Sequence, residues 1–122
     1  SMKAVLVRPR RVIDHTPTAD LAAGDVVVLG RIVGVAASPI AAGQLGSLCI
    51  DGEVRVEQAA VTHSRGGAVF WDDDGNSVLS LSGPGAATDA QADGVFMGFA
   101  LEATTAADTH VTVLLGQAVV QA

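Results

Sequence analysis

The chain has no tyrosine, one tryptophan and three phenylalanines, so aromatic residues make up only 3% of its 122 residues. This scarcity counts against a carbohydrate site, in which sugars stack on exposed rings. Charged residues are also few, at 16%, whereas hydrophobic residues reach 49%. A monomer of this size has too few polar side chains to cover its apolar surface. We therefore expect a homo-oligomer, or attachment to a larger protein surface.

Basic residues are scarce and unevenly placed. The chain has 7 of them against 13 acidic residues, which gives a net charge of -6. A protein that binds nucleic acid neutralises phosphates with clustered Lys and Arg, so no nucleic-acid partner is expected. No Lys or Arg follows Arg65, and more than half of the basic residues lie near the N-terminus: Lys3, Arg8, Arg10 and Arg11. The sequence therefore predicts a basic N-terminal arm on an acidic body.

A single cysteine cannot form an internal disulfide. Cys49 stands in the apolar stretch LCI, which predicts a small buried side chain. No apolar run approaches the ~18 residues that a membrane-spanning helix requires, so no membrane partner is expected.

Val, Ala, Leu and Ile dominate the composition, and 14 glycines are spread through the chain. This mixture favours many short strands joined by tight turns. We predict an all-β fold, a compact sandwich or barrel of about 8 to 10 short strands. The predicted strands are apolar or β-branched segments separated by Gly, Pro, Asp or Asn: KAVLV, DVVVLG, RIVGVA, GSLCI, EVRVE, AVFW, SVLSLS, VFMGFALEA, HVTVLLG and QAVVQA.

The pattern predicts one β domain over residues 14–122, preceded by residues 1–13 as the basic arm or as a first strand. Alternation is clearest in EVRVE, where Val54 and Val56 face one side and the charged residues the other. DVVVLG and HVTVLLG are more continuously apolar and should lie deeper. Residues 82–94 begin with SGPG and carry no apolar stripe, so they are predicted to form a long surface loop.

The sequence contains a weak internal repeat. The stretch GVAASPIAAGQLGSLCI, starting at Gly34, resembles GFALEATTAADTHVTVLL, starting at Gly98. Each has a glycine, an apolar residue and an alanine, followed by an Ala-rich turn and a strand. Similar apolar segments, DVVVLG and AVFWD, precede the two copies. The repeat predicts two related β units packed into one fold.

Three consecutive acids in AVFWDDDGNSVL raise the question of a metal site. Asp72, Asp74 and Asn76 have the spacing of a calcium loop. Such a loop also needs a glycine at its sixth position and a glutamate at its twelfth, where this chain has Ser77 and Gly83. We therefore expect no metal ligands and no cofactor here.

The dipeptide Asp74-Gly75 instead predicts a two-residue type I′ turn between two strands. This hairpin would place Trp71 opposite Val78 and Phe70 opposite Leu79. Two interpretations of Trp71 remain: it fills the edge of the β core, or it anchors an interface together with Phe70.

No catalytic residues are assigned, and the protein is not expected to be an enzyme. His15, His63 and His110 are far apart in the sequence, and none has a neighbouring His or Cys at metal-ligand spacing. The chain also lacks a G-x-S-x-G nucleophile elbow and a phosphate-binding G-x-x-x-x-G-K-[ST] loop.

A succession of four stretches, AAGDVVVLG, IVGVAASPIAAGQLGSLCIDGEVRV, GGAVFWDDDGNSV and MGFALEATTAADTHVTVLLG, resembles a known family. It is similar to the small capsid-cement (head decoration) proteins of tailed phages and prophages, some of which are labelled phage recombinases. The resemblance covers about Ala23 to Gly116, and its specificity lies in the order of the motifs. Phe70 stands where the family often has Tyr, and the segment after Arg55 lacks the usual proline.

The resemblance implies a compact β protein that binds the outside of the phage head and bridges subunits of the major capsid protein. Its location would be the capsid surface of the virion, and the host cytoplasm before assembly. Related decoration proteins form trimers or dimers, and a homotrimer is favoured here. Lys3, Arg8, Arg10 and Arg11 would then form a capsid-contact arm. The alternative function is a small β-barrel binding module for a carbohydrate or peptide.

Overall fold

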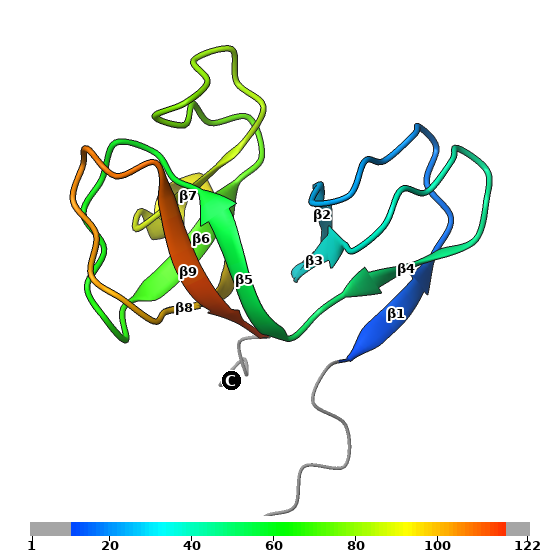
Figure 1. Cartoon of the computed structure of the whole chain (residues 1–122), viewed down its shortest axis with the longest axis horizontal. Helices are drawn as coiled ribbons and strands as arrows, with labels where there is room; N and C mark the ends of the chain where they lie inside the picture. Colours follow the sequence, from blue (N-terminus) through cyan, green and yellow to red (C-terminus); the bar gives the residue numbers. More distant parts are fainter. Residues whose placement is uncertain (1–10, 117–122) are drawn as a thin grey trace, which may run out of the picture.

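The computed structural model describes residues 11–116. This part of the chain folds into short strands and one 3-10 turn, as the alternation of apolar segments with Gly- and Asp-containing turns requires (Figure 1). The elements are β1 (Val12–His15), β2 (Val26–Leu29), β3 (Ile32–Ala36), β4 (Gly46–Cys49), β5 (Gly52–Glu57), β6 (Ala68–Asp72), β7 (Ala86–Thr88), η1 (Gln91–Asp93), β8 (Val95–Ala100) and β9 (His110–Leu115).

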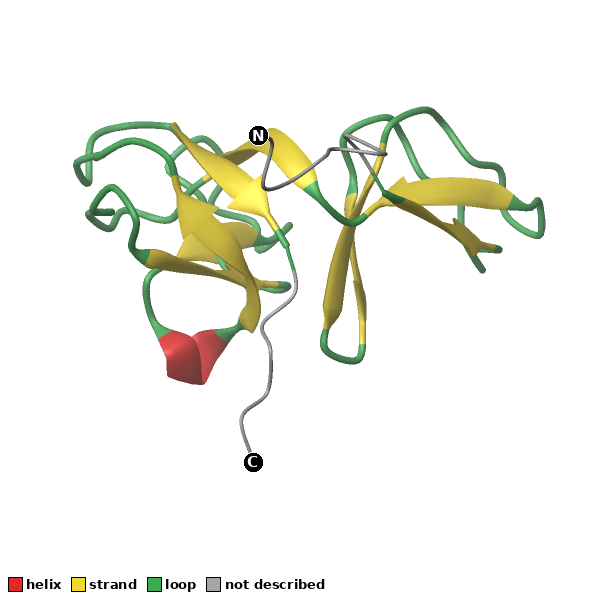
Figure 2. Cartoon of the chain, turned by 90° about the horizontal axis from the view of Figure 1, so that it is seen from below, coloured by secondary structure: helices red, strands yellow, loops and turns green. Residues whose placement is uncertain are grey.

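The strands form two antiparallel sheets. The first has four strands in the order β1-β4-β3-β2, and the second has five in the order β5-β9-β8-β6-β7. The chain passes from one sheet to the other between β4 and β5, and the sheets form two lobes with η1 at the margin of the second (Figure 2). The prediction of an all-β, sandwich-like fold is confirmed, and the sheets do not close into a barrel.

The two sheets repeat one topology. Strands β1, β2, β3 and β4 correspond to β5, β6, β8 and β9, because the strand order is the same and β7 is an addition at the edge. The pairs Val26↔Val35 and Val27↔Gly34 recur as Ala68↔Phe99 and Val69↔Gly98. The equivalence of Gly34 with Gly98 is the one the sequence repeat predicted.

The loops of the two units also correspond. An isolated bridge joins Leu21 to Ile40 in the first unit and His63 to Thr104 in the second. Gly24 donates its amide hydrogen to Ala36 O, and Gly66 donates to Ala100 O, each at 2.7 Å. Both glycines have positive φ, at 90° and 82°, in a turn that other residues rarely adopt. Two related β units therefore build the fold.

The sheets share one apolar core. Alternation gives the second sheet an inner face, which carries Val69, Trp71 and Val113, and an outer face. Val33 of the first sheet is fully buried in the same cluster, so a face of the first sheet packs against the inner face of the second. A smaller cluster lies on the other side of the first sheet, around Leu48 and Ile40.

Several predicted elements were wrong or lie elsewhere. The segment SVLSLS is not a strand, and residues 82–94 are not one loop, since they contain β7, whose three residues are all buried, and η1. The residues of β2 are half-buried rather than deep. Val54 and Val56 point opposite to exposed Glu53 and Arg55, as predicted. The segments KAVLV and QAVVQA lie outside the described residues.

Candidate interaction surfaces

The acidic segment after β6 is a turn, but it is not the predicted hairpin. The amide of Gly75 donates to Asp72 O at 3.1 Å, so the turn is centred on Asp73 and Asp74 rather than on Asp74 and Gly75. No non-glycine residue of the described range has positive φ, which excludes a type I′ turn here. Strand β6 instead pairs with β7, with Trp71 opposite Ala87. The prediction that Val78 and Leu79 face β6 was wrong.

The acids of this turn repel one another. Asp72 is half-buried at the end of β6. Loss of solvent around its carboxyl raises the pKa of Asp72, and so do its side-chain hydrogen bond to Asp74 and the negative charges of Asp74 and Asp93. The hydrogen bond from the backbone of Asp74 opposes this rise only in part. Over residues 11–116, no group of three or more His, Cys, Asp or Glu side chains is arranged to hold a metal ion.

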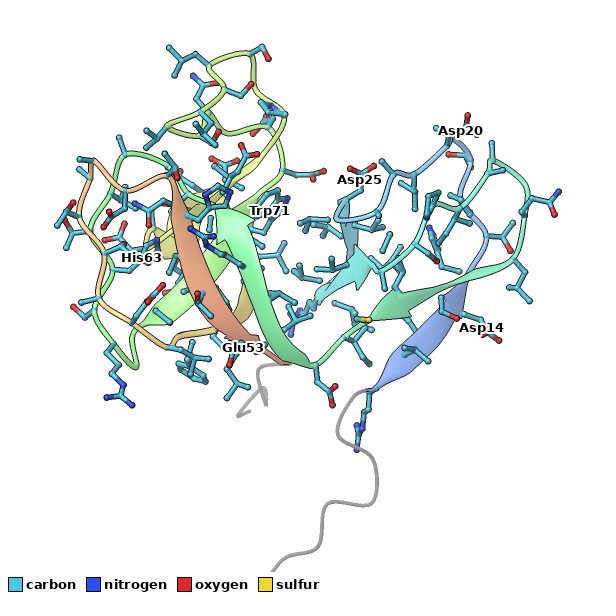
Figure 3. The ribbon with its side chains drawn as sticks, in the orientation of Figure 1. Asp14, Asp20, Asp25, Glu53, His63 and Trp71 are labelled. Carbon is cyan, nitrogen blue, oxygen red and sulfur yellow. The ribbon has the colours of Figure 1, made fainter. Side chains whose placement is uncertain are left out.

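Trp71 fills the core. Its side chain is 6% exposed, and its indole Nε1 donates to Asp73 Oδ1 at 3.2 Å (Figure 3). Gly85 lies against the ring so closely that a Cβ there would be 2.6 Å from Trp71 Cζ2. The tryptophan is therefore tied to the turn that follows β6 and to the segment that leads into β7, and it offers no exposed ring face.

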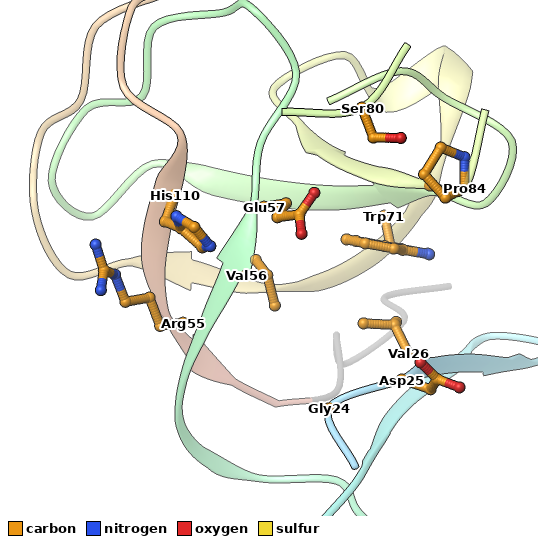
Figure 4. Close-up of a pocket in the computed structure, with 11 residues that line it drawn as sticks. Gly24, Asp25, Val26, Arg55, Val56, Glu57, Trp71, Ser80, Pro84 and His110 are labelled. Atoms are coloured by element: carbon orange, nitrogen blue, oxygen red, sulfur yellow. The ribbon is translucent and has the colours of Figure 1, made fainter. Parts of the chain in front are cut away.

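A groove of about 430 Å³ separates the two sheets beside Trp71 (Figure 4). Its walls come from the turn before β2, from β5, from β6 and from the segment before β7. Both charged and apolar residues line it, and the lining residues are Gly24, Asp25, Val26, Arg55, Val56, Glu57, Trp71, Ser80, Pro84, Gly85 and His110. Trp71 is its only residue with an indole or phenyl ring, and that residue is buried, so the groove lacks the exposed ring on which a sugar would stack.

A polar cluster is buried under the second sheet. His63 is 3% exposed, and its Nε2 is buried without a hydrogen-bond partner. Its backbone pairs with Thr104, whose Oγ1 donates to Gln58 Oε1 at 2.7 Å. Burial lowers the pKa of His63, and the negative charge of Asp89 opposes this effect only in part. The neutral imidazole is therefore the form that the fold favours.

An aromatic surface lies on the outer face of the second sheet. The ring centroids of Phe70 and Phe96 are 5.9 Å apart, and those of Phe96 and Phe99 are 5.3 Å apart, both pairs edge to face. Phe99 pairs across the sheet with Leu114, and each of the two is 48% exposed. We call these four residues the phenylalanine face.

Sequence reasoning found only one member of this face. It named Phe70 and Trp71 as a candidate interface pair, but consecutive strand residues point to opposite sides of a sheet. Phe70 is half-buried on the outer face, whereas Trp71 is buried on the inner face. Phe96, Phe99 and Leu114 were missed. The available signal was the alternation of HVTVLLG, in which Leu114 falls on the side opposite Val113 and Leu115.

Of the four basic residues of the predicted arm, only Arg11 lies within the described residues, directly before β1. Lys3, Arg8 and Arg10 fall in residues 1–10. Arg11 is exposed, its backbone amide donates to a carboxylate oxygen of Asp51, and its carbonyl accepts from Ile50 N at 3.0 Å. The arm is thus joined to the fold beside the connection between the two sheets.

These features define a small two-sheet β protein with exposed apolar side chains on its exterior. The family model of phage cement proteins matches residues 7–116, and the chain belongs to that family. Membership implies a structural, capsid-associated role in the virion rather than an enzymatic one. A comparison with curated proteins found no match, and a comparison with solved structures found none. No helix among the described residues is long and apolar enough to cross a membrane.

Proposed function

We propose that this protein binds the outside of a phage head and stabilises the capsid lattice, with the major capsid protein as its partner. The observation that carries the proposal is the family match over residues 7–116, which spans both sheets. The protein acts by binding and performs no catalysis. It is made in the host cytoplasm and then resides on the capsid surface as a homotrimer.

The composition supports a binding role. Hydrophobic residues form 49% of the chain and charged residues 16%, so surface burial against other proteins lowers the free energy of the exposed apolar side chains. The alternative role, binding of a carbohydrate or peptide, has less support because the groove between the sheets presents no exposed aromatic ring.

The experiment is co-sedimentation of the purified protein with undecorated heads of its source phage, with unexpanded and expanded shells compared. Saturable binding to expanded shells is expected. A folded protein that sediments with neither shell contradicts the proposal.

Within this function we propose that Lys3, Arg8, Arg10 and Arg11 contact the capsid. Arg11 is bonded through its backbone to Asp51 and Ile50, so a deletion that tests the arm without disturbing the fold ends at Arg10. Deletion of residues 2–10 is expected to abolish head binding and to leave the circular dichroism spectrum unchanged. Loss of folding would show that these residues form part of the domain itself. Replacement of the three arginines by lysine is the matched control, because it keeps the charge.

A further inference from the structure

The phenylalanine face occupies a position that is covered in the first unit. Its residues Phe70, Phe96, Phe99 and Leu114 correspond in the repeat to Val28, Val33, Val35 and Cys49. Val33 is fully buried against the second sheet, and Val28 and Val35 pack on the same core. The second unit has larger apolar side chains at these positions, yet two of them, Phe99 and Leu114, are 48% exposed, and Phe70 and Phe96 are only half-buried.

A second apolar surface lies on the loop that projects from the same lobe between β6 and β7 (Figure 1). Residues 77–82, which we call the leucine loop, carry Leu79 and Leu81, which are 58% and 78% exposed. The base of the loop is fixed. Ser77 is 1% exposed and its Oγ donates to Glu57 Oε1 at 2.8 Å, and Val78 N donates to Gln58 O at 2.9 Å. The two leucines are thus held out into solvent on a rigid base.

The two surfaces match in being apolar. Ser77 N donates to Ser80 O at 2.9 Å and Ser80 N donates to Ser77 O at 3.2 Å, so the chain turns at Val78 and Leu79. Leu79 lies in this turn and Leu81 follows it directly, which makes the loop an exposed apolar tip. Burial of this tip against the phenyl rings would remove apolar surface of both from water.

The two surfaces also match in charge. The acidic turn lies beside the leucine loop, because Gly85 N donates to Gly75 O at 3.0 Å and closes the loop onto Asp74. Exposed Arg65 lies beside the phenylalanine face, since the next residue, Gly66, bonds to Ala100 O directly after Phe99. Exposed Glu53, opposite Leu114, borders the other edge of the face. Glu53 shares that edge with exposed Arg55, so the edge carries both signs of charge. Arg65 offers a positive charge beside Phe99 to an incoming acidic turn.

We propose that the phenylalanine face of one copy binds the leucine loop of a second copy, with Asp74 near Arg65. The inference rests on the homo-oligomer of the proposed function and identifies its contact. Because the two surfaces differ, the contact is heterologous, and such contacts close into rings when the rotation between copies permits. A closed ring of three is the expected product.

The test uses the whole chain without capsids. Two cysteines, Phe99→Cys and Leu81→Cys, are introduced together in a Cys49→Ala background, and the oligomer is oxidised and analysed by mass. Covalent dimers and trimers are expected from the double variant, and none from either single variant. Covalent dimers from Phe99→Cys alone would mean that two phenylalanine faces meet each other, which overturns the proposal. An uncross-linked double variant, or a chain that is monomeric by light scattering, also overturns it.

Charge reversal tests the orientation. Arg65→Glu is expected to weaken self-association by about tenfold or more, and Asp74→Arg in the same chain is expected to restore it. All these positions are exposed, so the circular dichroism spectrum serves as the folding control. A double variant that stays dissociated refutes the pairing. Head binding is measured separately: a protein that self-associates but does not bind heads contradicts the proposed function and leaves this inference intact.

Discussion

Replacement of His63 by leucine is expected to make the protein more stable and less sensitive to acid. His63 stands where the first unit has Leu21, at the same isolated bridge. Its Nε2 is buried with no hydrogen-bond partner, and an unsatisfied buried polar atom costs about 1–3 kcal/mol. Leucine removes that atom and keeps a large side chain in the site. We expect a gain of about 1–2 kcal/mol in the free energy of unfolding at pH 8.

The pH dependence follows from the lowered pKa of His63. In the unfolded chain the imidazole protonates near its ordinary value of 6.5, while in the fold it stays neutral to lower pH. Between these two values the unfolded state binds one more proton, so the native state loses about 1.4 kcal/mol per pH unit as the pH falls. Above pH 6.5 the folded protein keeps its full stability with respect to His63. Below the pKa of His63 in the folded state, a further fall in pH causes no further loss of stability from this group. The leucine variant lacks this loss.

The assay is urea unfolding of both proteins at several pH values between 8 and 4. The difference between the two unfolding free energies should be constant above pH 6.5 and should grow below it. A difference that does not change with pH would refute the argument. Two controls accompany it. Leu21→His should introduce a weaker sensitivity to acid into the first unit, because position 21 is only half-buried. Asp89→Asn should extend the pH range in which stability falls to lower pH, since Asp89 raises the pKa of His63.

Three further outcomes are expected. Gly98→Ala should cost about 2–5 kcal/mol, because a Cβ there would lie 2.0 Å from Leu114 O at a φ of 155°, whereas Gly116→Ala, with no heavy atom within 4 Å, should change stability by less than about 0.5 kcal/mol in urea unfolding. Asp72→Asn should stabilise the protein at neutral pH. Because the pKa of Asp72 is raised in the folded state, the wild type gains stability as the pH falls through that pKa, so the unfolding free energies of the two proteins should converge in acid. A difference that stays constant with pH would contradict this. Millimolar calcium should leave the melting temperature unchanged, and a rise of several degrees would reveal a metal site at the acidic turn.

Strand positions were predictable where alternation or a continuous apolar run was bounded by turn residues. EVRVE, AVFW and HVTVLLG became β5, β6 and β9 within a residue or two. The internal repeat also predicted two related β units, and Gly34 and Gly98 do occupy equivalent ladder positions. Periodicity was sufficient to locate these strands because each lies in an antiparallel sheet and has one buried face, so apolar residues recur at every second position.

Two errors had a common physical cause. SVLSLS has the composition of a strand, and residues 86–88 have that of a helix or loop. However, β8 pairs with one edge of β6, so only the other edge of β6 can accept a further strand. Ala86 and Ala87 take that edge because their small side chains fit against Trp71 and are fully buried, and Gly85 permits the close approach. The leucine segment is thereby excluded from the sheet. Tertiary packing decided between two candidate strands, and local propensity does not contain that information.

The interaction surfaces were less predictable than the fold, because they depend on where the two units differ. The connection between β2 and β3 is only Gly30 and Arg31, whereas β6 and β8 are separated by residues 73–94, which include the leucine loop. The phenylalanines of the phenylalanine face likewise stand where the first unit has valines, and those valines are packed in the shared core. The first unit folds without the long connection and without the phenylalanines, so the β topology itself requires neither. Both changes add exposed apolar side chains, which weaken the solubility of an isolated monomer and are retained with advantage only where a second protein covers them. The departures of the second unit from the first therefore coincide with the two surfaces of the proposed contact between copies.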